Sequence, residues 1–272
     1  MPKLGLSLGV QSGAFLKQSP SFDASYQAVL DKATAMGYPK PSAPQQVKQN
    51  QLIVDLKAAG IWTLLDCFQV YANDGSSSFG LINWKNPTGN IGSISGTLTF
   101  NKYGFLGSGA GFINSGYNPT TNAVNLSIYN ASYGVWKYAN DNTSGRSIVG
   151  NAAGTNQIVG NSSVSYNSRI FTTSDLGASA PNQATGLIFI SRQGASGATN
   201  NTVWSVNGSN TNFSPFGTVS IPNANFAVLT SSIASGNASS YFGGISMFFT
   251  GANLSGKSTE FTTAMTTYIN SL

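Results

Sequence analysis

Few side chains in this sequence can act in catalysis. Only 8% of the 272 residues are charged, no histidine is present, and Cys67 is the single cysteine. Without histidine, the Ser-His-Asp and Cys-His mechanisms and ordinary zinc sites are excluded. We expect Cys67 to be a buried, inert thiol rather than a nucleophile. The sequence therefore predicts a structural or binding protein and not an enzyme, with no cofactor and no metal.

Carboxyl groups are the remaining candidates for catalysis. Glycoside hydrolysis needs two of them, held about 5 to 9 Å apart across the scissile bond. After residue 75 the acids are Asp141, Asp175 and Glu260. Glu260 is expected in the first turn of a helix, where it complements the helix dipole. Asp141 and Asp175 stay open as a catalytic pair, because folding could bring them together.

The run Asn140-Asp141-Asn142 offers oxygen ligands of the kind that calcium prefers. Asn and Asp side chains also build turns by bonding to their own backbone. Both readings remain, and the turn is the favoured one.

Aromatic and amide side chains offer a different chemistry. The chain has 16 Phe, 11 Tyr and 4 Trp, and residues 129–141 interleave rings with amides. Amides can hydrogen-bond sugar hydroxyls while aromatic faces stack on a pyranose ring, so this segment is a candidate glycan site. The candidate residues are Tyr133, Trp136, Tyr138, Asn140 and Asp141. The alternative is that alternate rings of a strand point into a sandwich core.

Helices are expected near both ends of the chain. Apolar residues at helical spacing predict helices over residues 22–36, 42–59 and 258–271. Ser21 and Ser42 are the expected N-caps of the first two.

Between these helices the pattern is that of short strands separated by Gly, Asn and Ser clusters. The expected strands are Phe68–Ala72, Leu81–Trp84, Ile94–Phe100, Val124–Tyr129, Gly134–Tyr138, Leu187–Ser191, Thr202–Val206, Phe226–Thr230 and Ile245–Thr250. Many short strands with such turns predict a mainly β chain, an antiparallel jelly-roll sandwich with a short N-terminal helical segment and a C-terminal helix.

The composition changes near residue 75. Five of the eight acids but only five of the 31 glycines precede this point, which lies in the turn signal Asn73–Ser78. We therefore expect residues 1–20 to be an arm, residues 21–74 a helical lead-in packed on the sandwich, and residues 75–272 the sandwich with its closing helix.

The expected arm alternates apolar and small residues at the period of a strand. Its apolar positions are Leu4, Leu6, Leu8 and Val10. The arm is either the first strand of the domain or an anchor that adds to the sheet edge of a partner in an assembly.

Charge and hydropathy exclude two kinds of partner. The net charge is +5, but the 13 Lys and Arg residues are scattered and form no basic stripe, so nucleic-acid binding is not expected. No apolar run reaches the roughly 20 residues of a membrane span. Residues 1–18 lack the continuous apolar core of a secretion signal, so we expect use without signal-directed secretion; the alternative is a signal removed before this numbering begins.

Three segments resemble bacteriophage virion proteins, especially those of Bacteroidetes phages. Residues 26–88 are similar to the start of these proteins, residues 111–136 to their central strands, and residues 242–272 to their last core strand and closing helix. In this family a helical lead-in precedes a concanavalin A-like or laminin-G-like jelly roll. The run Trp204–Gly208 is similar to the hairpin of laminin-G-like sandwiches, and it is also a plain hairpin signal.

The resemblance implies a structural protein of the virion, made in the bacterial host cytoplasm: a tail fibre, head fibre or spike. It implies a homo-oligomer, most simply a trimer, that contacts other virion proteins and host-surface glycan. A purely architectural capsid or tail component is the alternative. The acidic cluster of laminarinase-like enzymes and the calcium cluster of legume lectins are both absent from the sequence, so neither activity is carried over.

Overall fold

The computed structural model describes residues 21–141, 143, 145–152, 155–162, 165–172, 176–178, 184–194, 202–213, 220–235 and 240–272. The predicted arm, with Leu4, Leu6, Leu8 and Val10, lies outside these residues, and so does Asp175.

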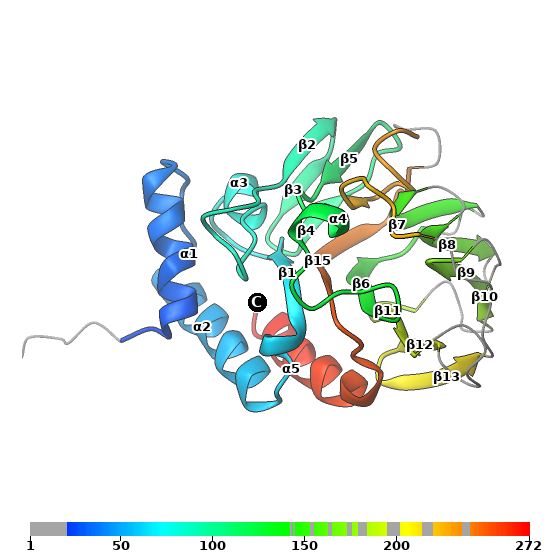
Figure 1. Ribbon diagram of the computed structural model, residues 1–272. Coiled ribbons are helices and arrows are strands. Elements are labelled where there is room, and N and C mark those ends of the chain that lie inside the picture. The colour runs from blue at the N-terminus through cyan, green and yellow to red at the C-terminus, as the bar shows by residue number, and fades with distance from the viewer. Residues whose placement is uncertain are drawn as a thin grey trace, which may run out of the picture.

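Two antiparallel sheets form a β-sandwich, which confirms the predicted fold class. Sheet A has eight strands, in the order β13 (Ser209–Phe213), β12 (Thr202–Val206), β11 (Gly186–Gln193), β6 (Asn130–Ala139), β15 (Gly244–Gly251), β4 (Gly104–Leu106) and β3 (Thr99–Asn101), with β1 (Leu65–Val70) also paired to β15. Sheet B has seven, in the order β10 (Leu176–Ala178), β9 (Ser165–Ile170), β8 (Asn156–Ser162), β7 (Arg146–Ala152), β14 (Ala227–Val228), β5 (Gly111–Asn114) and β2 (Ser93–Gly96). Figure 1 shows both sheets.

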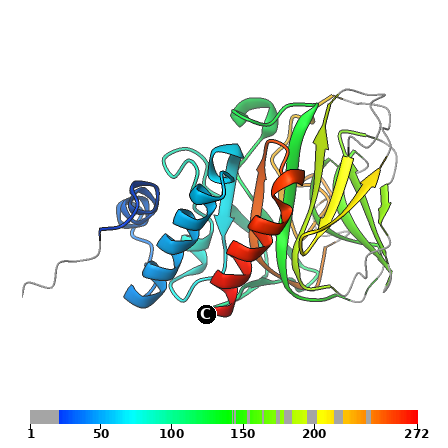
Figure 2. The same cartoon turned by 90° about the horizontal axis from the view of Figure 1, so that it is seen from below.

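Three longer helices lie on the side of sheet A that faces away from sheet B (Figure 2). They are α1 (Ala24–Ala35), α2 (Ala43–Ala58) and α5 (Ser258–Asn270). The short helices are η1 (Trp62–Leu64), α3 (Ser77–Gly80), α4 (Pro119–Asn122) and η2 (Ser255–Lys257). Among the described residues, no helix is both long and apolar enough to cross a membrane.

The central strands of sheet A are buried on both faces because they separate two hydrophobic cores. On β15, Ile245 and Phe248 belong to the core between the sheets, whereas Met247 and Phe249 belong to the core under the helices. All eight residues of this strand are buried. A strand covered on both faces has a continuous apolar sequence. The aromatic side chains of such a strand can therefore lie either between the two sheets or under the helices.

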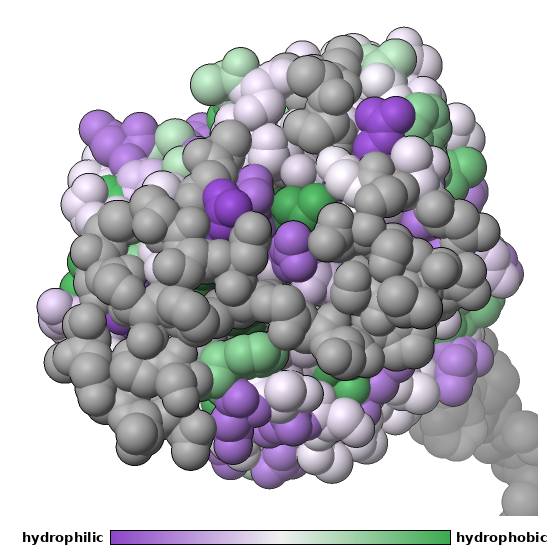
Figure 3. All heavy atoms as spheres, turned by 90° about the vertical axis from the view of Figure 1, so that its right-hand side faces the viewer, coloured by the Kyte–Doolittle hydropathy of each residue, from purple (hydrophilic) through white to green (hydrophobic). Residues whose placement is uncertain are grey.

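On the face at the right of Figure 1, where β8, β9 and β13 lie, the described residues are mostly hydrophilic or neutral, with scattered hydrophobic ones (Figure 3). Such isolated apolar groups are normal on a protein surface.

Several predicted boundaries differ from the observed ones. Asp23, not Ser21, caps α1, and its carboxylate accepts a hydrogen bond of 2.8 Å from the Ser25 amide. Ser42 caps α2 as predicted. The expected division at residue 74 is not a division of the fold, because β1 pairs with β15 and is part of sheet A.

Two predicted strands are wrong, because side chains take the backbone donors that a neighbouring strand would have used. Leu81–Trp84 contributes only an isolated bridge at Ile82, and Asn83 Oδ1 accepts from the Phe68 amide at 3.0 Å. In the segment Val124–Tyr129, the Asp66 carboxylate accepts the first backbone N–H groups. The predicted strand Ile94–Phe100 is split between β2 and β3, which lie in different sheets.

Candidate functional site

Tyr133 does not belong to a surface site. Its ring is fully buried between the two sheets, beside Phe226, and its hydroxyl donates to the Arg169 carbonyl. No ligand can stack on a ring that is packed on all sides, so the prediction of Tyr133 as a glycan contact is wrong. The alternative reading, with the ring in the sandwich core, holds for this residue.

Asp141 forms the predicted turn. Its side chain is buried, and its carboxylate accepts from the Thr143 amide at 2.8 Å and from the Phe242 amide at 2.9 Å. These bonds join the end of β6 to the segment before β15, which is a structural task. Asn140 is exposed next to it and does not line the pocket described below.

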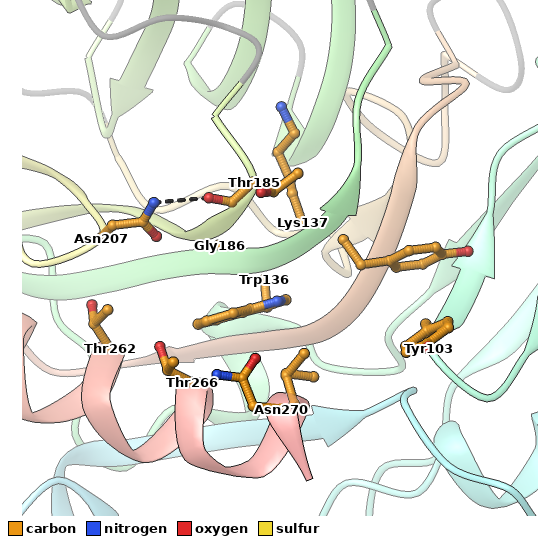
Figure 4. Close-up of a pocket in the computed structure, with 11 residues that line it drawn as sticks. Tyr103, Trp136, Lys137, Thr185, Gly186, Asn207, Thr262, Thr266 and Asn270 are labelled. Carbon is orange, nitrogen blue, oxygen red and sulfur yellow. Dashed lines mark hydrogen bonds between the residues drawn. The ribbon is translucent and has the colours of Figure 1, made fainter. Parts of the chain in front are cut away.

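Trp136 and Tyr138 lie on the other face of sheet A, toward α5. There they line a pocket of about 470 Å³ between the sheet and that helix (Figure 4). Tyr103, from the turn between β3 and β4, lies at the same pocket, with its ring centroid 6.0 Å from that of Tyr138. Trp136 is only 8% exposed, whereas Tyr103 is 39% exposed. The pocket therefore has one anchored ring and one accessible ring.

The helix contributes a row of polar side chains. Thr262, Thr266 and Asn270 follow one another at i, i+4 and i+8, so they share one face of α5. The adjacent face, with Phe261 and Met265, is buried in the core under the helices. Packing of that apolar face fixes the helix and turns the polar row toward Trp136, as Figure 4 shows.

Asn207 holds the wall of the pocket that faces the helix. Its Nδ2 donates to the Thr185 carbonyl at 2.8 Å, and its Oδ1 accepts from the Leu187 amide at 2.9 Å. Asn207 itself has a φ of 50° in the turn between β12 and β13, a conformation that Asn tolerates. The amide therefore locks the entry to β11 in place.

Gly186 is required at this wall. Its φ is +110°, and a Cβ built on it would lie 1.9 Å from Asn207 Oδ1. A side chain here would push Asn207 off its two backbone partners.

Several polar groups around the pocket are unpaired in the part of the chain that the structure describes. No hydrogen bond is made there by Trp136 Nε1 or by the side chains of Thr262, Thr266 and Asn270. The Thr262 Oγ1 is buried and has no partner. Buried polar groups are normally paired, so the Thr262 Oγ1 is exceptional. The other groups are open to solvent and are available to a bound molecule that brings its own donors and acceptors.

The pocket is electrically neutral at its centre. Lys137 lines it only beside Trp136, and its ammonium points the other way, between the sheets, where it donates to the Tyr166 hydroxyl at 2.9 Å (Figure 4). Burial lowers the pKa of Lys137 to about 7, and the nearby Asp141 opposes that shift. Next to Tyr103 in the sequence, Lys102 has its ammonium 4.8 Å from the Tyr103 ring centre and donates to the Leu272 carbonyl.

Sequence reasoning found Trp136 and Tyr138 but missed the helix side of the pocket. The pattern of a polar row on an amphipathic helix usually indicates a solvent-exposed face, and this is how Thr262, Thr266 and Asn270 would be interpreted from the sequence. One feature of the sequence could have indicated them. Beside the narrow apolar stripe of α5 lies a row of short, neutral polar residues, where a solvent-exposed helix face usually carries charged ones.

Comparison with known proteins identifies the fold. No protein-family profile and no curated protein sequence matches the chain. Among solved structures, a mutant of Trypanosoma rangeli sialidase displaying trans-sialidase activity is 9% identical, with a TM-score of 0.52, over 81% of this chain and 39% of the sialidase. Domain 4 of AbnA, a GH43 extracellular arabinanase from Geobacillus stearothermophilus, in complex with arabinotriose, is 15% identical, with a TM-score of 0.49, over 73% of this chain and 98% of that domain. The likeness to the sialidase, at so low an identity, is one of fold, and it agrees with the antiparallel β-sandwich.

Proposed function

We propose that this chain is a carbohydrate-binding protein without catalytic activity, and that it holds a sugar ring in the pocket between α5 and sheet A. The observation that carries the proposal is the convergence of aromatic surface with unpaired, uncharged hydrogen-bonding groups at one pocket. Pockets of about this size, mostly apolar with a few placed polar groups, are typical of small-ligand sites.

Each class of side chain has its own part in binding. The accessible ring of Tyr103 and the exposed edge of Trp136 pack on the apolar C–H face of the sugar. Thr266 and Asn270 exchange hydrogen bonds with its hydroxyls, and Thr262 gains the partner that its buried Oγ1 lacks. A sugar hydroxyl that pairs the Thr262 Oγ1 removes an existing desolvation cost, which favours the bound state.

The absence of catalysis is proposed from the same lining. Among the described residues around the pocket, none is a carboxylate, whereas glycoside hydrolysis uses two. The carboxylate of Asp141 is already occupied by two backbone amides.

We further propose that the protein is exposed on a bacteriophage particle as a fibre or spike subunit and contacts host-surface glycan. The support is the resemblance of residues 26–88 to phage virion proteins, together with the low charge of a surface rich in Asn, Ser and Thr. Repetition of a weak sugar site around an oligomer gives avidity. Mass spectrometry of purified particles tests this placement, because the chain must then be among the particle proteins.

A glycan array tests carbohydrate binding. The intact protein should bind at least one bacterial polysaccharide, and Tyr103→Ala should weaken that binding about tenfold, since it removes one stacking ring. Tyr129→Ala is the matched control: Tyr129 is 42% exposed, close to the 39% of Tyr103, and does not line the pocket. No binding by the intact oligomer would leave the architectural alternative, a virion component that holds no receptor.

A further inference from the structure

A second pocket lies near the start of β1 and shares no lining residue with the first. Its volume is about 470 Å³. The residues that matter for its chemistry are Asp66, Lys85, Asn86, Asn122, Val124 and Asn125. They come from β1 and from two loops, one after α3 and one around the end of α4.

The Asp66 carboxylate builds the wall of this pocket but has no free acceptor position. It accepts from the backbone amides of Val124, Asn125 and Leu126 at 2.9–3.2 Å, from Asn125 Nδ2 at 2.9 Å and from the Tyr117 hydroxyl at 3.0 Å. A carboxylate has about four lone-pair sites, so five donors exhaust it. Asp66 therefore fixes the loop and offers nothing further to a ligand.

The amide groups at the pocket have assigned orientations, because one end of each is already used. Asn86 Oδ1 accepts from the Gly89 amide at 3.1 Å, and Asn122 Oδ1 accepts from the Asn118 amide at 2.8 Å. Within the described residues the NH₂ ends of both side chains remain unbonded, so both present donors. Asn125 has the opposite orientation, since its Nδ2 is bonded to acceptors and its oxygen is left over. Asn90 also lines the pocket, and no hydrogen bond to a described residue fixes its amide.

Lys85 adds a positive charge to these donors. Its ammonium lies 4.7 Å from the centre of the Trp62 ring and donates to the Trp62 carbonyl at 2.6 Å. An ammonium has three N–H donors, so this single bond leaves two. Half-burial lowers the pKa of Lys85 because the charge is desolvated, while Asp66 opposes that shift. An anion bound next to the ammonium would replace the hydration that burial removes.

We infer that this second pocket recognises a carboxylate, carried by an acidic saccharide. The ammonium of Lys85 and the NH₂ groups of Asn86 and Asn122 can only donate, Asn125 offers an oxygen, and Asn90 can turn either end of its amide to a ligand. Donors thus outnumber acceptors, and a carboxylate is an acceptor-only group that matches such a set. Val124 is 87% exposed on the loop that Asp66 holds rigid, and it covers the apolar side of the sugar ring. The inference that the ligand is a saccharide rests on the proposed function, whereas the inference that it is an anion rests only on the groups of this pocket.

The test is a titration followed by NMR of the full chain labelled with ¹⁵N, because the side-chain NH₂ signals of Asn86 and Asn122 report directly on the pocket. The probes are D-glucuronate, D-glucose and sodium sulfate at constant ionic strength. We expect glucuronate to shift both signals with a millimolar Kd, and glucose and sulfate to bind at least tenfold more weakly.

Two variants assign the effect to the proposed groups. Lys85→Gln removes the charge, and Asn122→Asp keeps the shape and the bond to Asn118 while replacing the NH₂ donors with a charged acceptor. Each should weaken glucuronate binding at least tenfold. Lys48→Gln is the control, because the Lys48 ammonium also donates to a backbone carbonyl but lies at a different pocket. An unchanged amide spectrum outside the pocket shows that each variant is folded.

Other outcomes overturn the inference. If glucose binds as tightly as glucuronate, the pocket does not select a carboxylate. If sulfate binds as tightly, the pocket does not require a saccharide. If no probe shifts the two signals, the pocket is not a binding site for any of them. The proposed function is read separately, from the Trp136 Nε1 and Asn270 signals of the first pocket, so failure at one pocket is distinguishable from failure at the other.

Discussion

Lys137 Nζ lies 2.9 Å from the Tyr166 hydroxyl in the interior between the two sheets. The ammonium also lies 5.2 Å from the centre of the Tyr166 ring and 5.4 Å from that of Tyr241. The rings and the nearby Asp141 stabilise the charged form of Lys137. Desolvation by burial has the larger effect, and it lowers the pKa of Lys137 to about 7. Sheet A thus carries, next to Trp136, a lysine that titrates near neutral pH.

Stability should consequently rise with pH between about 7 and 8.5. The unfolded chain keeps Lys137 protonated up to its ordinary pKa of 10.5, whereas the folded chain releases the proton near 7, so the unfolded state binds more protons in this window. The free energy of unfolding should increase by up to about 1.4 kcal/mol per pH unit. Above pH 9 the buried thiol of Cys67 and the buried tyrosines, whose pKa values are raised, reverse the trend.

Lys137→Met isolates this contribution. Urea unfolding at pH 6, 7, 8 and 8.5 should show a variant that is more stable than the parent at pH 6 and has a flatter pH dependence. Identical slopes in the two proteins would mean that Lys137 keeps its proton in the folded state.

Gly186→Ala should damage both stability and sugar binding. The new Cβ would lie 1.9 Å from Asn207 Oδ1 at a φ of +110°, so Asn207 must leave the Thr185 carbonyl and the Leu187 amide. We expect a loss of about 1–3 kcal/mol from the backbone conformation alone. Gly256→Ala is the control, because a Cβ there meets nothing within 4 Å. Thermal unfolding of both variants checks this, and equal melting temperatures would contradict it.

Asp66→Asn should be among the most destabilising single-atom changes in the chain. The buried carboxylate accepts three consecutive backbone amides, Val124 to Leu126, and an amide side chain keeps one acceptor while turning NH₂ toward the others. Bonds to a charged acceptor contribute about 1.5–3 kcal/mol each, and buried donors left unpaired cost about 1–3 kcal/mol.

The matched control is Asp31→Asn, at an exposed carboxylate that accepts from the Gln27 side chain. Denaturant unfolding should show a loss of several kcal/mol for Asp66→Asn and about 0.5 kcal/mol or less for the control. Similar losses in both would mean that the loop after α4 does not depend on the carboxylate.

The parts of the fold that could be predicted are those whose burial follows a simple period. Helices α1, α2 and α5 and strands β11, β12 and β15 carry their apolar residues at regular spacing, and each was predicted within a few residues. Strands β7 to β9 were missed, because the buried positions of a run such as Asn156–Ser162 include Asn156 and Gly160 beside Ile158, which leaves too few apolar residues on the inner face. Their strand conformation comes from pairing with neighbours, which is not a local property.

The candidate site shows the same limit. Alternate residues of a strand lie on opposite faces, as Tyr133 and Trp136 do on β6, but where the sheet is buried on both sides this period does not say which face can reach solvent. The helix α5 decides that question by leaving Trp136 partly uncovered next to Thr262 and Thr266. These residues come from distant parts of the sequence, and no local pattern links them.

Thr262→Val should change stability and binding in opposite directions. The Thr262 Oγ1 is buried without a partner, so its hydroxyl loses water on folding and gains no hydrogen bond. Valine has the same shape and no hydroxyl, so it removes this destabilising contribution. We expect the unliganded protein to become about 1 kcal/mol more stable, and sugar binding at the pocket to weaken several-fold, because the ligand loses a partner.

The control is Thr263→Val on the same helix. Its hydroxyl is exposed and donates to the Thr259 carbonyl at 2.9 Å, and it does not line the pocket, so both quantities should stay nearly constant. Thermal unfolding without ligand and calorimetric titration with the polysaccharide found on the array measure the two effects separately. If Thr262→Val stabilised the protein and left the affinity unchanged, Thr262 would be a packing residue, and the sugar would be held by Tyr103, Thr266 and Asn270 without it.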